Sequence, residues 1–203
     1  HVHADLIAGL PGETLSTFAA AFDTLLSWGV DEIQLGLLKR LRNTPLCGTM
    51  PPSWFEPFSP YTVLFTDTLS FQDISRIRRM ARYWDIVYNS GNFLITLAPL
   101  VRTPGAFFRF LEFSDWLYRK EGKTRSIELN RMAALIHDYF LEAHFCTRDE
   151  LLANLEADYT RCSRTTRPDF LQKDANSPKT AARKDPFARQ HRHRPPLPGD
   201  GES

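Results

Sequence analysis

The chain has 203 residues, of which 42% are apolar and 12% aromatic, enough for one well-packed domain. Its formal net charge is +1, and its three cysteines, Cys47, Cys146 and Cys162, are too far apart for a disulfide framework or a clustered metal site. No stretch approaches the ~20 continuous apolar residues of a membrane span, and no basic segment leads an apolar one at the N-terminus. We therefore expect a protein of the cytoplasm, without a membrane partner.

The first segment, VHADLIAGL at residues 2–10, is a short apolar run closed by Pro11 and Gly12. It predicts a buried strand followed by a turn. Because this run begins almost directly after His1, we expect the chain to start inside a larger domain.

Apolar residues then recur at helical spacing over residues 15–26, with Glu13 at the positive end of the expected helix and Gly29 placed to end it. EIQLGLL at residues 32–38 predicts a second strand. A strand, a helix and a strand in this order form a βαβ crossover, which requires parallel strands. Since two strands cannot complete a sheet buried on both faces, further strands are expected elsewhere.

Residues 45–60 hold five prolines with Trp54, Phe55 and Phe58 among them, which favours an ordered connection over a flexible linker. Ser70 with Asp73 approximates a capping box and predicts a helix running past Trp84. Apolar and helical segments follow at residues 93–101, 106–121 and 126–145. Residues 107–113 are aromatic nearly all round the helix, which predicts burial against another layer, such as a missing part of the domain.

Thr147 and Glu150 match a capping box and start the last segment with helical periodicity. Residues 163–203 hold nine Lys and Arg against five Asp and Glu, with six of the fourteen prolines. A tail of this composition buries too little apolar surface to offset its ordering entropy. We expect it to be mostly disordered.

The strongest functional signal is DLIAGLPGET at residues 5–14, at the C-terminal end of a strand, where parallel α/β folds bind ligands. Gly9 and Gly12 leave room for a ligand, backbone N–H groups at the helix start can donate to its oxygens, and Asp5 can accept from its hydroxyls. The alternative is structural, because any tight strand-to-helix turn uses glycine and proline. The spacing does not match a Walker loop.

DLIAGLPGET also resembles the strand and turn of radical S-adenosylmethionine (SAM) barrels, and QLGLLKRLRNTPL at residues 34–46 resembles the barrel strand that follows. Residues 83–98 and 117–135 resemble a helical domain of unknown function that follows cobalamin-binding radical SAM modules, and the similarity extends to about residue 171. The implied fold class is an α/β remnant of a partial TIM barrel at 1–45, a mainly α-helical domain at 46–162 and a disordered basic tail at 163–203.

The resemblance implies a parent enzyme that cleaves SAM reductively at a [4Fe-4S] cluster and acts on an unknown substrate, with cobalamin as a possible methyl carrier. Residue by residue, it places Asp5, Ile7 and Gly9 near the SAM ribose and adenine, Gly12 in the adjoining turn, and Gln34 and Leu35 at the mouth of the next strand. Asp5 stands where the motif commonly has glycine.

The cysteine motif CxxxCxxC, which holds the cluster in this family, is absent from the chain, as is any recognisable cobalamin ligand. The expected partners are therefore the missing N-terminal barrel and cobalamin domain, and the chain alone is expected to be inactive. Two other hypotheses stay open. The chain could be a non-catalytic helical interaction module or gene remnant, or its tail could bind nucleic acid through residues 189–194. The last is disfavoured because no aromatic residues interleave with the cations.

Weaker signals have structural explanations. The polar residues 88–92 could face a substrate cavity, but a helix end with Gly91 as its C-cap is favoured. Residues 122–124 imitate the end of a phosphate loop, yet Leu117 stands where its first glycine belongs. Neither of two histidine pairs has acidic or thiol partners in the sequence nearby, which favours surface or core positions over a metal site: His1 with His3, and His137 with His144.

Overall fold

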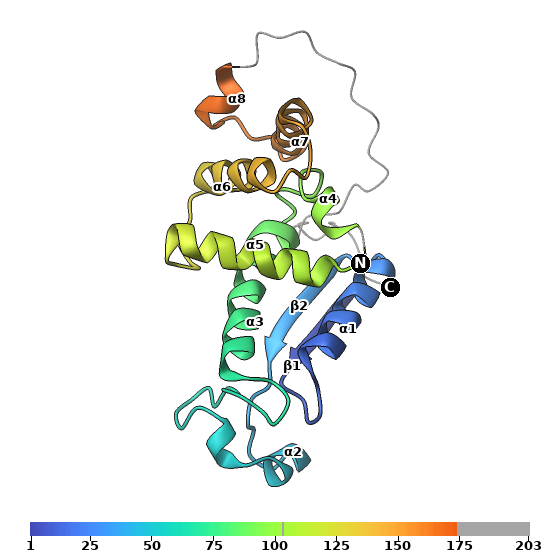
Figure 1. Cartoon of the computed structure of the whole chain (residues 1–203), viewed down its shortest axis with the longest axis vertical. Coiled ribbons are helices and arrows are strands. Elements are labelled where there is room, and N and C mark those ends of the chain that lie inside the picture. Colours follow the sequence, from blue (N-terminus) through green and yellow to red (C-terminus); the bar gives the residue numbers. More distant parts are fainter. Residues whose placement is uncertain (103, 174–203) are drawn as a thin grey trace, which may run out of the picture.

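The computed structural model describes residues 1–102 and 104–173 and is mainly helical, with a small two-stranded sheet in its N-terminal part (Figure 1). Strand β1 (His3–Ala8), helix α1 (Leu15–Ser27) and strand β2 (Glu32–Leu37) form the expected βαβ crossover. The strands are parallel, and the register pairs His3 with Glu32 and Ala8 with Leu37. That the unit belongs to a barrel remains an expectation.

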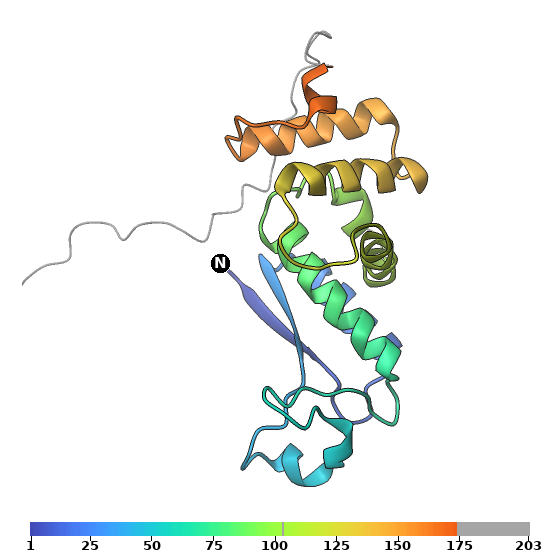
Figure 2. The same ribbon diagram turned by 90° about the vertical axis from the view of Figure 1, so that its left-hand side faces the viewer.

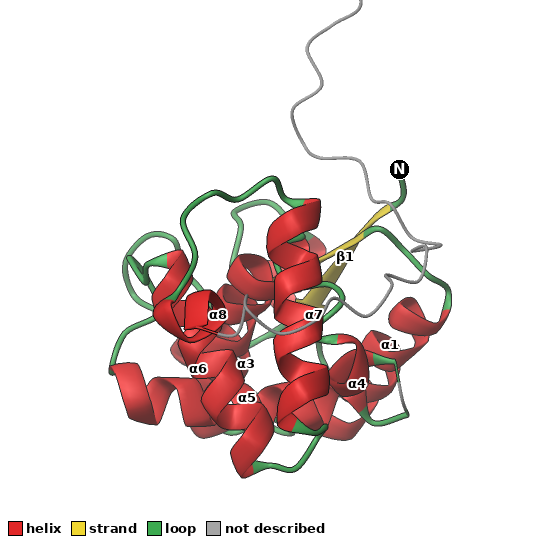
Figure 3. Ribbon diagram, turned by 90° about the horizontal axis from the view of Figure 1, so that it is seen from above, coloured by secondary structure: helices red, strands yellow, loops and turns green. Residues whose placement is uncertain are grey.

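The remaining helices stack along the long axis of the molecule (Figure 1), so that α3, α5 and α6 overlap when it is seen from above (Figure 3). Their bounds are α2 Pro45–Thr49, the 3-10 turn η1 Pro52–Trp54, α3 Phe71–Trp84, the π-helical turn η2 Asp85–Asn89, α4 Ala98–Val101, α5 Ala106–Glu121, α6 Leu129–Glu142, α7 Arg148–Arg161 and α8 Asp169–Lys173. Within the described ranges, none of these helices is both long and apolar enough to cross a membrane.

The capping boxes expected for α3 and α7 are both present. Ser70 accepts from the N–H of Asp73 and Asp73 from that of Ser70, and Thr147 and Glu150 make the same reciprocal pair. Such boxes satisfy two of the N–H groups that a helix start leaves without intrahelical partners. Local sequence therefore fixes where these two helices begin.

The main core joins the sheet to the helices through α5. Phe107 of α5 packs edge-on against Phe18 and Phe22 of α1, and Phe110 does the same against Trp84 of α3. Trp84, Phe107 and Phe110 are fully buried. The expected burial against another layer is confirmed for all of these residues but Phe108, which is 43% exposed, and other parts of this chain form that layer.

The segment between β2 and α3 is ordered, as its aromatic residues predict. Phe55 is buried and pairs with Val63 in an isolated antiparallel bridge, and the ring of Trp54 lies 6.4 Å from that of Phe65. These contacts build a second, smaller core below the sheet. Phe58 does not take part in this packing as expected, because its side chain is 80% exposed.

Helix α6 is shorter than the helix expected over residues 126–145. Glu128 caps its start by accepting from the N–H groups of Asn130 and Arg131, and its end is followed by His144 with a positive φ of 54°. His144 therefore lies beyond α6 and does not share a helix face with His137.

Order also continues past residue 163, where the sequence predicts that it ends. Leu171 of α8 is buried, and the ring of Phe170 lies 4.9 Å from the imidazole of His137 on α6. These two apolar side chains let residues 163–173 pack against the helices. The prediction missed this because it used the average composition of residues 163–203. The basic stretch at 189–194 lies outside the described residues.

Candidate functional site

One face of the sheet is covered by α1 and the other is open. Side chains alternate along a strand, so Ala4, Leu6 and Ala8 contribute to the core. Asp5 and Ile7 point to the opposite face and are exposed there, and Asp5 lies directly opposite Gln34 in the register. In Figure 2 the strands lie at the left with α1 and α3 to their right, and no helix of the described chain lies beside them on the left. The structure thus brings together Asp5, Ile7 and Gln34.

His3 shares this open face and has two acidic neighbours, contrary to the expectation from sequence. Its Nε2 lies 3.2 Å from Asp5 Oδ1, and its Nδ1 lies 3.5 Å from Glu32 Oε2. The hydrogen bond with Asp5 raises the pKa of His3 above its ordinary value. In the part of the chain that the structure describes, no group of three or more His, Cys, Asp or Glu could hold a metal ion.

Gly9 and Gly12 lie in the turn after β1, and the local structure accounts for both. Gly9 has φ +96°, and a Cβ on it would lie 2.7 Å from Val63 Cγ1, so this position is filled by the protein itself. Gly12 has φ +73° and faces open space. The Gly9 N–H donates to Glu13 Oε2 at 2.8 Å, a bond that closes the turn. The structural explanation of these glycines is therefore sufficient.

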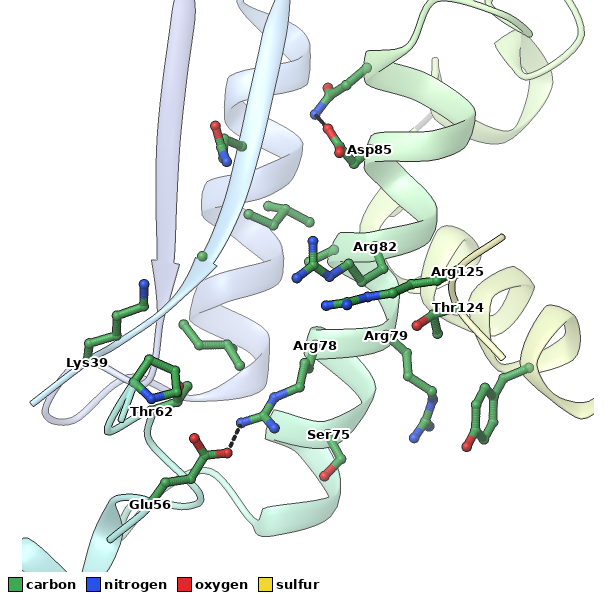
Figure 4. A pocket seen from close by; sticks show the side chains of 18 residues that line it. Lys39, Glu56, Thr62, Ser75, Arg78, Arg79, Arg82, Asp85, Thr124 and Arg125 are labelled. Atoms are coloured by element: carbon green, nitrogen blue, oxygen red, sulfur yellow. Dashed lines mark hydrogen bonds and ion pairs between the residues drawn. The ribbon is translucent and has the colours of Figure 1, made fainter. Parts of the chain in front are cut away.

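A cavity of about 790 Å³ lies between β2, α3 and the segment after α5 (Figure 4). Gln34 and Leu35 line it, so these two residues lie at an accessible site on β2. Asp5, Ile7, Gly9 and Gly12 are not among the residues that line it. The candidate residues thus divide between the open sheet face and this cavity, with Gln34 belonging to both.

The cavity wall carries five cationic side chains and two carboxylates, which are Lys39, Arg78, Arg79, Arg82, Arg125, Glu56 and Asp85. Arg78 pairs with Glu56 at 3.1 Å. Arg79 pairs with Asp115 at 3.1 Å and lies over the Tyr118 ring at 4.8 Å. Two of the five cations are therefore already matched by protein groups.

Helix geometry explains why α3 supplies most of this wall. Ser75, Arg78, Arg82, Asp85 and Asn89 are spaced by three or four positions and therefore follow one stripe along α3 and η2. The opposite side of α3 buries Ile77, Met80 and Trp84. The arginine-rich segment SRIRRMAR at residues 75–82 is the signal in the sequence that could have indicated this wall. Lys39 and Arg125 join the stripe only through tertiary structure.

Asn89 and Trp84 fix this wall to the sheet. Trp84 Nε1 and Asn89 Nδ2 both donate to the carbonyl of Ile33, each at 3.0 Å. These two bonds occupy the outer edge of β2 at Ile33, at one end of the cavity. Gly91 follows with φ +74°, and its N–H donates to the carbonyl of Tyr88, so the expected helix end is present. Asn89 also lines the cavity.

The cysteines of this chain do not fit an iron–sulfur cluster. The sequence lacks the CxxxCxxC spacing, and Cys146 and Cys162 are half-buried free thiols. Burial raises the pKa of the Cys146 thiol, which disfavours the thiolate that metals require. The cluster motif is thus absent from the sequence, and Cys146 and Cys162 do not replace it.

The fold and site together define a mainly helical domain joined to a parallel βαβ unit, with a cationic cavity at their junction. A family model described as a protein of unknown function, DUF4080, matches residues 53–199, and the chain belongs to this family. The match covers the helical part and begins after β2, so the sheet lies outside it. No curated protein and no solved structure matches the chain.

Proposed function

We propose that this chain is the C-terminal part of a cobalamin-dependent type of radical SAM enzyme. In this proposal the βαβ unit ends the parallel barrel, and the DUF4080 domain packs against the last strand. The parent enzyme cleaves SAM reductively at a [4Fe-4S] cluster held elsewhere and acts on an unidentified substrate. This chain alone lacks the cluster ligands and is inactive.

The observation that carries the proposal is the difference between the two edges of the sheet. Helix α3 lies along the outer edge of β2, and the Ile33 carbonyl there accepts from Trp84 and Asn89. Strand β1 pairs with β2 and with no other strand in the residues described. Unpaired strand edges invite a partner, and a two-stranded sheet is marginal alone. A preceding barrel strand added at β1 would satisfy both requirements.

The open face supports the same proposal. Helices cover the outside of a TIM barrel, so α1 marks the outer face of the sheet and the opposite face would line the interior. Asp5, Ile7 and Gln34 lie on that face. The Asp5 carboxylate can accept hydrogen bonds from ribose hydroxyls, and the Gln34 amide can donate or accept. Gly9 would act by shaping the turn, since Val63 already fills the space where a side chain of residue 9 would lie.

The test begins with the DNA upstream of the His1 codon, translated in frame. The proposal expects CxxxCxxC in that frame. The whole encoded protein is then purified without oxygen, supplied with iron and sulfide, reduced, and assayed for 5′-deoxyadenosine released from SAM. Product from the whole protein and none from this chain is the expected result; an upstream frame without the motif, or a whole protein with no SAM cleavage, overturns the proposal.

Two variants of the whole protein connect the assay to this chain. Asp5→Ala and Gln34→Ala should each weaken SAM binding about tenfold, the value of one lost hydrogen bond to a polar ligand. Asp138→Ala removes an exposed carboxylate of α6 and should leave SAM affinity unchanged. If the non-catalytic alternative is correct instead, the unmodified protein binds no SAM, and the two sheet variants do not differ from it.

A further inference from the structure

The cavity between β2 and α3 has an excess of positive charge that the protein does not neutralise. Of its five cations, Arg78 is paired with Glu56 and Arg79 with Asp115. Lys39, Arg82 and Arg125 make no hydrogen bond or ion pair through their side chains to any residue in 1–102 or 104–173. Figure 4 shows the guanidinium ends of Arg82 and Arg125 both directed toward β2.

The two carboxylates of the wall lie at the ends of this cationic group. Glu56 is held by Arg78 at one end, and Asp85 lies at the other, where Asn89 Nδ2 approaches its Oδ1 at 3.4 Å (Figure 4). Arg82 and Arg125 lie between them. Like charges repel, and no carboxylate of the wall separates these two guanidinium groups, so an anion between them would relieve the repulsion.

Neutral donors line the same cavity. The Ser75 and Thr124 side chains each offer a hydroxyl. Two backbone N–H groups of β2 contribute as well, and the pairing with β1 shows which ones. The N–H groups of Glu32 and Leu38 donate to carbonyls on the β1 side, at 3.2 and 2.9 Å. Because successive residues of a strand alternate in direction, the N–H groups of Leu35 and Leu37 point the other way, toward α3.

We propose that this cavity binds a multivalent oxyanion, a phosphate ester or a polycarboxylate, between Arg82 and Arg125. Planar guanidinium groups match the spacing of phosphate and carboxylate oxygens and form paired charge-assisted hydrogen bonds with them. Three unmatched cations favour a ligand with two or more negative charges over a monoanion. A volume of about 790 Å³ holds a small molecule as well as its anionic group. The inference does not depend on SAM chemistry.

The test is titration calorimetry of the full chain at low ionic strength, with pyrophosphate, citrate and acetate as separate probes. We expect pyrophosphate, citrate or both to bind at one site per chain, and acetate to bind more weakly than any multivalent probe that binds. Tighter binding of pyrophosphate indicates a phosphate ester as the natural ligand, and tighter binding of citrate indicates a polycarboxylate. Sodium chloride should weaken the binding because it screens the charges. Binding of neither multivalent probe, or equal binding of acetate, overturns the proposal.

A pair of double variants locates the site. Arg82→Gln with Arg125→Gln should weaken binding about tenfold to a hundredfold, the range expected for losing charge-assisted hydrogen bonds. Arg119→Gln with Arg148→Gln changes the net charge by the same amount at exposed positions outside the cavity and should leave affinity within about twofold. Equal losses in both pairs would mean non-specific attraction and overturn the site.

Thermal unfolding without ligand separates binding from structure. If Arg82 and Arg125 serve an anion, replacing them by glutamine relieves repulsion, so the unfolding midpoint of that double variant should equal or exceed that of the unmodified chain. Pyrophosphate or citrate, whichever binds, should raise the midpoint of the unmodified chain and not that of the variant. A variant midpoint lowered without ligand would show a structural role and count against the proposal.

Discussion

Asp158 on α7 accepts a hydrogen bond from the backbone N–H of Thr96 at 2.8 Å, although 62 residues separate them in the chain. Its side chain also accepts from the Ile95 N–H and the Thr96 hydroxyl, and it pairs with Arg161 at 3.1 Å. Burial raises the pKa of Asp158 in spite of these donors. The carboxylate thus ties α7 to the turn that precedes α4.

Replacing this carboxylate should be among the most destabilising single changes in the helical part. Asp158→Ala leaves three donors without an acceptor, in a site where Asp158 and Thr96 are fully buried, and should lower the free energy of unfolding by about 3 kcal/mol or more. Urea denaturation measures the change. Asp138→Ala, at an exposed position of α6, should change it by less than about 0.5 kcal/mol; similar losses in the two variants would contradict the role of Asp158.

Asp23 of α1 caps the start of a different helix. Its two carboxylate oxygens accept from the N–H groups of Gly105 and Phe107, each at 2.8 Å, and no side chain of α5 caps that end. Asp23→Ala should cost about 1–2 kcal/mol of stability, and Asp23→Asn, which keeps one acceptor, about half of that. Chemical denaturation tests the order; equal stability of the two variants would argue against capping.

Gly9 gives a direct test of what its missing side chain is for. Gly9→Ala places a Cβ 2.7 Å from Val63 Cγ1 at φ +96°, and should cost about 2 kcal/mol or more. Adding Val63→Ala creates room, so the double variant should lose less than the sum of the single losses. Gly48→Ala has no atom within 4 Å and should cost little. Strict additivity of the first two changes would contradict the close approach.

The pH dependence of stability should carry a contribution from Glu13. Burial raises the pKa of Glu13 in spite of the N–H groups of Gly9 and Leu10, so its protonated form is favoured by folding. The stabilising contribution of Glu13 is fully present below its unfolded pKa of 4.5 and is lost as the pH rises through its folded pKa. Glu13→Gln cannot titrate, so the stability of this variant should rise relative to the unmodified chain as the pH rises above the unfolded value of 4.5.

Glu150 supplies a control of opposite sign. Hydrogen bonds from the N–H and hydroxyl of Thr147 lower the pKa of Glu150, so its stabilising contribution is present above the unfolded value and is lost as the pH falls through the folded one. The unmodified chain should therefore gain stability relative to Glu150→Gln as the pH rises. If the two variants diverge from the unmodified chain in the same direction, the assignment to these two groups is wrong.

Features that depend on neighbours in sequence could be predicted. The apolar spacing of residues 15–26, the capping boxes at Ser70 and Thr147, and Gly122 at the end of α5 each act within one or two turns of helix. The parallel pairing of β1 with β2 follows from the intervening helix. These signals are local, so a single sequence contains them in full.

The cationic cavity could not be predicted in the same way. Arg82 and Arg125 come from segments separated by α5, and their convergence depends on how α3 packs against that helix. Asp23 likewise caps a helix more than eighty residues away. The family motif directed attention to Gly9 and Gly12, whose backbone geometry explains them, while the arginine stripe on α3 has no motif to mark it.

The covered edge of β2 limits how copies of this chain can associate. A molecule with two open strand edges can add neighbours on both sides and grow into a fibre. Here Trp84, Asn89 and α3 cover one edge, and among the described strands only β1 offers the other. Edge-to-edge pairing of two copies through β1 would therefore use the one open strand edge of each copy, and association would stop at a closed dimer.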